Sequence, residues 1–149
     1  MRKGTIPRIS ISLVLILILA QLSGCSRTIQ ELRKSDQTVV FAAKEPYQTV
    51  YNKIIEQARQ CYQTGGFRGH TVVQGDLDSD LRKGVVTIAM IESTTASVRN
   101  DIIADIKAAS DDYTVVTVYY DGKHRFIAEN MAKWVRHDST NCGDTEDTE

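Results

Sequence analysis

The spacing of apolar residues predicts a helix after residue 46. Apolar side chains recur every three or four positions from Tyr47 to Tyr62, which is typical of a helix that packs on one side. Pro46 precedes this stretch, and proline suits the first turn of a helix because its missing N–H costs nothing there. The pattern therefore predicts a helix that begins near Pro46 and carries Cys61 on its buried face.

Runs of β-branched, aromatic and other apolar residues predict a set of strands around this helix. The expected strands cover residues 38–43, 67–74, 84–91 and 113–120. Residues 75–80 are acidic and contain glycine, and they are expected to form a turn. Residues 101–108 fit either a strand or a helix. The short polar connection at residues 110–112 favours a strand, because it is typical of a hairpin.

A second amphipathic helix is expected after the last strand. Asp121 can cap it, and its apolar stripe is Phe126, Ile127, Met131, Trp134 and Val135, ending near His137. The element order is then β-α-β-β-(β)-β-α. Strands in a run with segregated helices predict an α+β fold, an antiparallel sheet of four to five strands with two helices packed on one face. This single domain is expected to span residues 38–142.

The first 25 residues have the layout of an export signal. Basic residues at the start are followed by an apolar stretch, Ile9 to Ala20, and then by Leu22-Ser23-Gly24-Cys25. About a dozen uninterrupted apolar residues are short for a transmembrane helix, which needs roughly 20. An uncleaved anchor and ordinary secretion stay open as alternatives.

Leu22-Ser23-Gly24-Cys25 resembles the lipobox of bacterial lipoprotein precursors, and the resemblance covers residues 1–25. It implies that residues 1–24 are a signal peptide that is removed, and that lipid is attached to Cys25. In that family aspartate after the cysteine commonly signals inner-membrane retention. Ser26 stands here instead, which implies the periplasmic side of the outer membrane, with the inner membrane as the lesser alternative.

Two polar segments flank the expected domain. Residues 25–37 are expected to be a tether, which would reach about 40 Å if fully extended. Ile29 and Leu32 could share one helix face, so a short helical turn stays open as an alternative. Residues 143–149 form an acidic tail that is expected to be disordered.

The cysteine count predicts a disulfide once the resemblance is accepted. With Cys25 acylated, Cys61 and Cys142 are left as a pair in an exported and oxidising compartment. Their bond would close a long loop and stabilise the fold by roughly 4 kcal/mol in the chain-entropy model. Two free thiols remain the alternative.

Charge argues against nucleic acid as a partner. The chain has 18 basic and 19 acidic residues, and three of the basic residues but no acidic one lie in residues 1–24. The rest carries 15 basic and 19 acidic residues, a formal charge of −4 without a basic cluster. Without a polybasic patch, attachment to the membrane has to come from the lipid on Cys25.

Motifs for catalysis, metals or cofactors are missing from the sequence. His70, His124 and His137 lack partners at the spacing of a zinc site. Asp76 to Asp80 begins like a calcium loop, but the required glycine and glutamate positions hold other residues. The sequence also contains no Gly-x-Ser-x-Gly nucleophile motif. We therefore expect no catalytic residues, no metal and no cofactor.

These features favour a non-catalytic, membrane-anchored lipoprotein that acts as an accessory or interaction subunit of the cell envelope and contacts an envelope protein. The first alternative is a small-ligand or lipid-binding module with a pocket between sheet and helices. The second is a hydrolase without a recognisable motif.

Overall fold

Five strands form one antiparallel sheet in the computed structural model, which describes residues 28–65, 69–94, 97–137 and 142. The order across the sheet is β1-β5-β4-β3-β2. The strands are β1 (Thr38–Ala43), β2 (Gly69–Asp78), β3 (Lys83–Glu92), β4 (Val98–Ser110) and β5 (Tyr113–Tyr120). Strands β2 to β5 follow one another as neighbours, whereas β1 pairs with β5 and forms the opposite edge.

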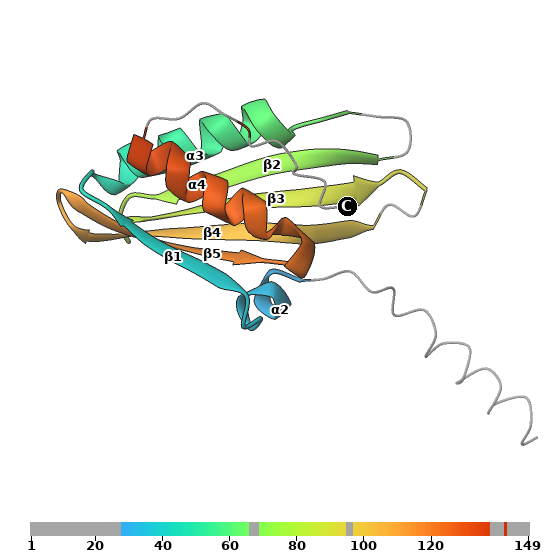
Figure 1. Cartoon of the computed structure of the whole chain (residues 1–149), viewed down its shortest axis with the longest axis horizontal. Coiled ribbons are helices and arrows are strands. Elements are labelled where there is room, and N and C mark those ends of the chain that lie inside the picture. The colour runs from blue at the N-terminus through green and yellow to red at the C-terminus, as the bar shows by residue number, and fades with distance from the viewer. Residues whose placement is uncertain (1–27, 66–68, 95–96, 138–141, 143–149) are drawn as a thin grey trace, which may run out of the picture.

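Two helices, α3 (Tyr47–Tyr62) and α4 (Arg125–His137), cover one face of this sheet side by side (Figure 1). A short 3-10 helix, η1 (Gly122–His124), connects β5 to α4, and Asp121 caps it as the sequence predicts. The α+β fold class is therefore confirmed, with five strands. Residues 101–108 are part of β4, as the hairpin connection indicates.

The core lies between the two helices and the sheet. Helix α3 packs mainly on β2 and β3, and α4 packs on β1 and β5. Alternate residues of each strand point into this layer, as the two-residue period of a strand requires. Its largest fully buried side chains include Ile54 and Val50 of α3, Ile102 and Ile106 of β4, and Trp134 and Met131 of α4.

Strand β2 is longer than the sequence predicts. Residues 75–78 were expected to turn, yet they pair with residues 83–86 of β3, and the turn lies at residues 79–82. Asp78 closes this turn by accepting the N–H of Leu81 at 2.8 Å. The prediction was wrong because β2 is an edge strand, and its exposed glycine and acidic residues resemble turn chemistry.

The stretch expected to be a tether contains a packed helix, α2 (Ile29–Arg33). Its first turn has a capping box, in which the Thr28 hydroxyl accepts the Glu31 N–H and the Glu31 carboxylate accepts the Thr28 N–H. Leu32 is fully buried. Ile29 and Leu32 allowed a short helical turn, but two apolar residues in a polar segment carry little periodic signal, so the packing of α2 on the sheet could not be predicted.

Helix α2 lies against β4 and β5 on the face of the sheet opposite α3 and α4 (Figure 1). Ile102 and Ala104 of β4 belong to the main core, whereas Ile103 between them is buried outside it. Arg33 fixes α2 to this face through a two-pronged ion pair with Asp105, whose Nε–Oδ2 distance is 2.9 Å. Both faces of the sheet therefore bury apolar residues.

Cys61 and Cys142 are joined by a disulfide in the structure, with their Cα atoms 5.2 Å apart. The carbonyl of Cys142 accepts hydrogen bonds from the Tyr62 hydroxyl at 3.0 Å and from the Asn130 side chain at 3.1 Å. These bonds hold residue 142 against the end of α3 and the middle of α4.

The predicted signal peptide and Cys25 lie outside the described residues, as do residues 25–27 of the expected tether and the acidic tail at 143–149. Within the described part of the chain, no helix is both long and apolar enough to cross a membrane.

Candidate functional site

A cavity of about 210 Å³ lies between the sheet and the two long helices, at the end where α3 stops and α4 starts. Its apolar wall comes from Ile88 and Met90 of β3, Ile102 of β4 and Ile127 of α4. The end of α3 and the bridge between Thr64 and Thr71 form the remaining apolar and weakly polar rim. Asp101 and His124 line the same cavity, so it has one strongly polar wall.

A β-bulge creates that polar wall. Ile102 pairs with Ile88 of β3, but Asn100 pairs with Ala89, so Asp101 between them has no residue opposite it. An extra residue in one strand breaks the alternation of faces and can re-aim a side chain. Asp101 and Ile102 consequently both line the cavity, although neighbouring residues of a regular strand point to opposite faces.

Asp101 is a buried carboxylate held by an ion pair. Its side chain is 7% exposed, and Oδ1 accepts a hydrogen bond from Arg99 Nε at 2.7 Å. This hydrogen bond, together with the attraction between the two charges, raises the pKa of Arg99 above its ordinary value. Arg99 also contacts the sulfur of Met90, on the cavity side of the sheet.

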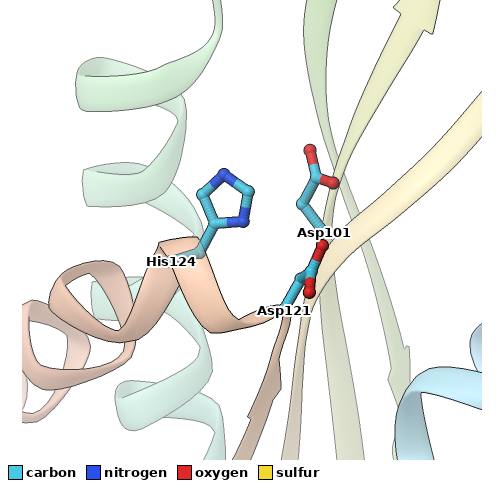
Figure 2. Close-up of side chains that lie close together, drawn as sticks. All are labelled: Asp101, Asp121 and His124. Atoms are coloured by element: carbon cyan, nitrogen blue, oxygen red, sulfur yellow. The ribbon is translucent and has the colours of Figure 1, made fainter.

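Asp101, Asp121 and His124 form a polar cluster where β5 leads into α4. One possible ligand atom from each lies within 4.8 Å of the others. The main chain draws the two aspartates together, because the N–H of Asp121 donates to the carbonyl of Asp101 at 3.1 Å. Figure 2 shows the imidazole of His124 on η1 facing the two carboxylates across the junction.

One nitrogen of this cluster lacks a protein partner. Nδ1 of His124 is buried and has no hydrogen-bond partner among the described residues. Asp121 is oriented by its capping role, since its Oδ1 accepts the N–H of Gly122 at 2.8 Å. The cluster therefore combines two oriented carboxylates with a histidine nitrogen that has no hydrogen-bond partner in the described part of the chain.

Burial also acts on Tyr62, which lines the same cavity. Loss of water raises the pKa of its phenol, and a hydrogen bond with Asn130 opposes that shift. The hydroxyl therefore remains protonated and donates to Cys142. Its ring lies 6.0 Å from the ring of Trp134, so the tyrosine forms part of the packed wall.

The residues predicted from the sequence are only partly at this site. Cys61 lines the cavity and is bonded to Cys142. Of the three histidines, His124 belongs to the polar cluster, whereas His70 lies on β2 and His137 ends α4.

Sequence reasoning missed Asp101 and its proximity to Asp121 and His124. The only signal in the sequence was the position of the polar Asp101 directly before Ile102 and Ile103. In a regular strand Asp101 and Ile102 would point to opposite faces. The capping role of Asp121 was predictable, but its neighbourhood was not, because that depends on pairing between β4 and β5.

A larger groove of about 620 Å³ runs beside α2 and the edge strand β2. Its lining includes Val73, which packs in the main core. It also includes Thr87, which lies between the core residues Val86 and Ile88 and therefore points to the opposite face of the sheet. The groove therefore wraps around the edge of the sheet. The smaller cavity lies between the sheet and the helices, is less open than the groove, and is the better candidate for a specific site.

No protein-family model and no curated protein matches the sequence. Among solved structures, the chain is similar to the human StarD13 (DLC2) lipid transfer and protein localization domain. The TM-score is 0.42 at 10% identity, covering 89% of this chain and 97% of that domain. A likeness of this degree carries no argument about what the present chain binds.

Proposed function

We propose that this protein is an exported, lipid-anchored binding domain without catalytic activity. It takes a small apolar or amphiphilic molecule into the cavity between the sheet and its helices. The cavity itself is the observation that supports this function. Pockets between layers of a fold, apolar with a few convergent polar groups, are the usual form of small-molecule sites.

The size of the cavity limits the ligand. Pockets for drug-sized molecules measure about 300–1,000 Å³, and the cavity of about 210 Å³ is smaller. A small molecule fits, or one end of a longer molecule such as the tip of an acyl chain. Ile88, Ile102 and Ile127 would surround the apolar part. Asp101 and His124 would face its polar end.

The resemblance at Leu22-Ser23-Gly24-Cys25 supports an anchor at the periplasmic side of the outer membrane. Helix α2 starts at Ile29 after the cap Thr28, so only two residues separate Cys25 from the folded part. Three residue steps reach at most about 11 Å. We therefore expect the domain to lie against the headgroups, close to a source of amphiphilic ligands.

An accessory subunit that contacts an envelope protein is the second candidate. Strands β1 and β2 are the two edges of the sheet, and Val40 of β1 is 61% exposed. An edge strand offers unpaired N–H and C=O groups to an added strand of a partner. A protein captured by crosslinking at Val40 but not at Thr71 would favour this candidate.

The test of ligand binding uses residues 26–149 exported behind an ordinary cleavable signal, which carries every described element. Native mass spectrometry is expected to detect a co-purifying small molecule. After its removal, N-phenylnaphthylamine, a small uncharged fluorescent probe, is expected to bind. Thr71→Phe fills the cavity from β2, and at least about tenfold weaker binding is expected.

Thr117→Phe is the matched control, because Thr117 lies on β5, is not part of the cavity lining and is only half-buried. It should leave probe binding unchanged. Equal probe binding by both variants, without a co-purifying molecule, would reject the cavity as a binding site.

A further inference from the structure

We infer that Asp101, Asp121 and His124 form a binding site for a divalent transition-metal ion, with Zn²⁺ as the metal of choice. The three side chains come from the bulge of β4, the cap residue between β5 and η1, and η1 itself. Their possible ligand atoms lie within 4.8 Å of one another. The inference goes beyond the proposed ligand-binding function: Asp101 and His124 also line the cavity, whereas Asp121 does not.

The unused nitrogen of His124 is the first reason. Nδ1 is buried and has no hydrogen-bond partner in the described chain, although it faces two carboxylates (Figure 2). A buried polar atom without a partner is destabilising. A metal ion between the imidazole and the carboxylates would satisfy this nitrogen, since neutral imidazole is the commonest nitrogen ligand of such metals.

The two carboxylates can bind a metal while they also accept hydrogen bonds. Each carboxylate offers about four lone-pair positions. Arg99 uses Oδ1 of Asp101, and the N–H of Gly122 uses Oδ1 of Asp121. Hydrogen bonds of this kind orient metal-binding side chains. With Arg99 counted, the cluster still carries one net negative charge, which favours a cation.

The geometry requires only small movements. Zn²⁺ binds histidine nitrogen and carboxylate oxygen at about 2.1 Å, so two ligand atoms at a tetrahedral angle lie about 3.4 Å apart. Separations of at most 4.8 Å would have to close by about 1.4 Å, which side-chain rotation can supply. The backbone hydrogen bond from Asp121 to Asp101 holds the main chain of both residues in place during that movement.

The donor set selects the class of metal. Calcium and magnesium prefer six or more oxygen ligands, whereas one imidazole and two carboxylates suit zinc and related first-row ions. Three protein ligands leave a fourth position for water or for the polar end of a molecule in the cavity.

Zn²⁺ titration of residues 26–149 without an affinity tag tests the site. Isothermal titration calorimetry is expected to give one ion per chain with micromolar or tighter affinity. Asp121→Asn and His124→Gln should each weaken binding at least about tenfold. Asparagine caps a helix as well as aspartate, so the first variant removes the charge and keeps the start of η1.

His137→Gln is the matched control, because His137 is an exposed histidine at the other end of the helical segment. It should bind Zn²⁺ like the unchanged chain. Circular dichroism in the presence of a chelator checks that each variant is folded.

Absence of stoichiometric Zn²⁺ binding by the unchanged chain would overturn the inference. So would Zn²⁺ binding by the Asp121→Asn and His124→Gln variants that is as tight as that of the unchanged chain. The outcome is separable from the proposed function, because Asp121→Asn should still bind N-phenylnaphthylamine. Co²⁺ substitution adds a direct readout, since its visible absorption should change when Asp121 or His124 is replaced.

Discussion

Tyr51 shows how single residues set the distance between α3 and the sheet. Its ring packs over Gly75 of β2 and Gly84 of β3, where an added Cβ would meet the tyrosine side chain. At Gly75 such a Cβ would also meet Ile55. Burial raises the pKa of the Tyr51 phenol, the attraction of Arg59 opposes the shift, and Asp76 adds to it. The two glycines therefore allow a close approach of helix and sheet.

Gly75→Ala is expected to lower the free energy of unfolding by about 1–3 kcal/mol, because the new methyl group overpacks the contact with Tyr51 and Ile55. Urea denaturation followed by tryptophan fluorescence of Trp134 measures the change. Gly65→Ala is the control: a Cβ there meets nothing within 4 Å, so a change of less than about 0.5 kcal/mol is expected. Similar losses at both glycines would contradict the role given to Tyr51.

At the scale of elements, α2 and the bulge of β4 decide how the two faces of the sheet are used. Five residues are too few to form a stable isolated helix, so α2 depends on its capping box and on the burial of Leu32. The bulge places Asp101 beside Ile102 on the cavity side. After the bulge the alternation resumes, so Ile103 is buried on the α2 side and Asp105 meets Arg33 there.

Leu32→Ala is expected to lower the free energy of unfolding by about 2–5 kcal/mol, since it truncates a fully buried side chain that covers the second face of the sheet. Thermal and urea denaturation of residues 26–149 measure it. Leu81→Ala makes the same chemical change at a turn position that is 61% exposed, and it should cost less than about 0.5 kcal/mol. Equal stability of the two variants would mean that α2 is a tether after all.

At the scale of the whole molecule, the two ends of the described chain are tied to the fold in different ways. Residue 142 is bonded to Cys61 and held by Asn130 and Tyr62. The start is tied by α2, and the proposed lipid on Cys25 would lie three residue steps before its cap, Thr28. An anchor so close to the packed domain would restrict its orientation at the membrane.

Cys25→Ser in the full chain is expected to abolish lipid attachment, because serine has no thiol to carry the lipid. The signal peptide should then remain, and an unprocessed precursor should appear on a gel, without labelling by radioactive palmitate. Ser26→Ala keeps Cys25 and should mature normally. Normal maturation and labelling of the Cys25→Ser variant would reject the anchor.

Much of the fold could be predicted because its elements have local periods. The stripe from Tyr47 to Tyr62 and the alternation from Tyr113 to Tyr120 each report which side chains are buried, and both elements form there. The short polar connection at residues 110–112 likewise indicated that β4 is a strand. The capping role of Asp121 was equally local, and one member of the candidate site was therefore placed correctly.

The amino-acid sequence by itself determined the α+β class, the two long helices, and the prediction of an exported chain with an acylated Cys25. Only the tertiary structure decided that Leu32 is buried, that β2 continues to Asp78, and that Asp101 meets Asp121 and His124. The physical reason is the range of the interactions. A helix or strand period depends on neighbours in the chain, whereas a bulge and a buried polar cluster depend on the register between strands that the sequence pattern does not encode.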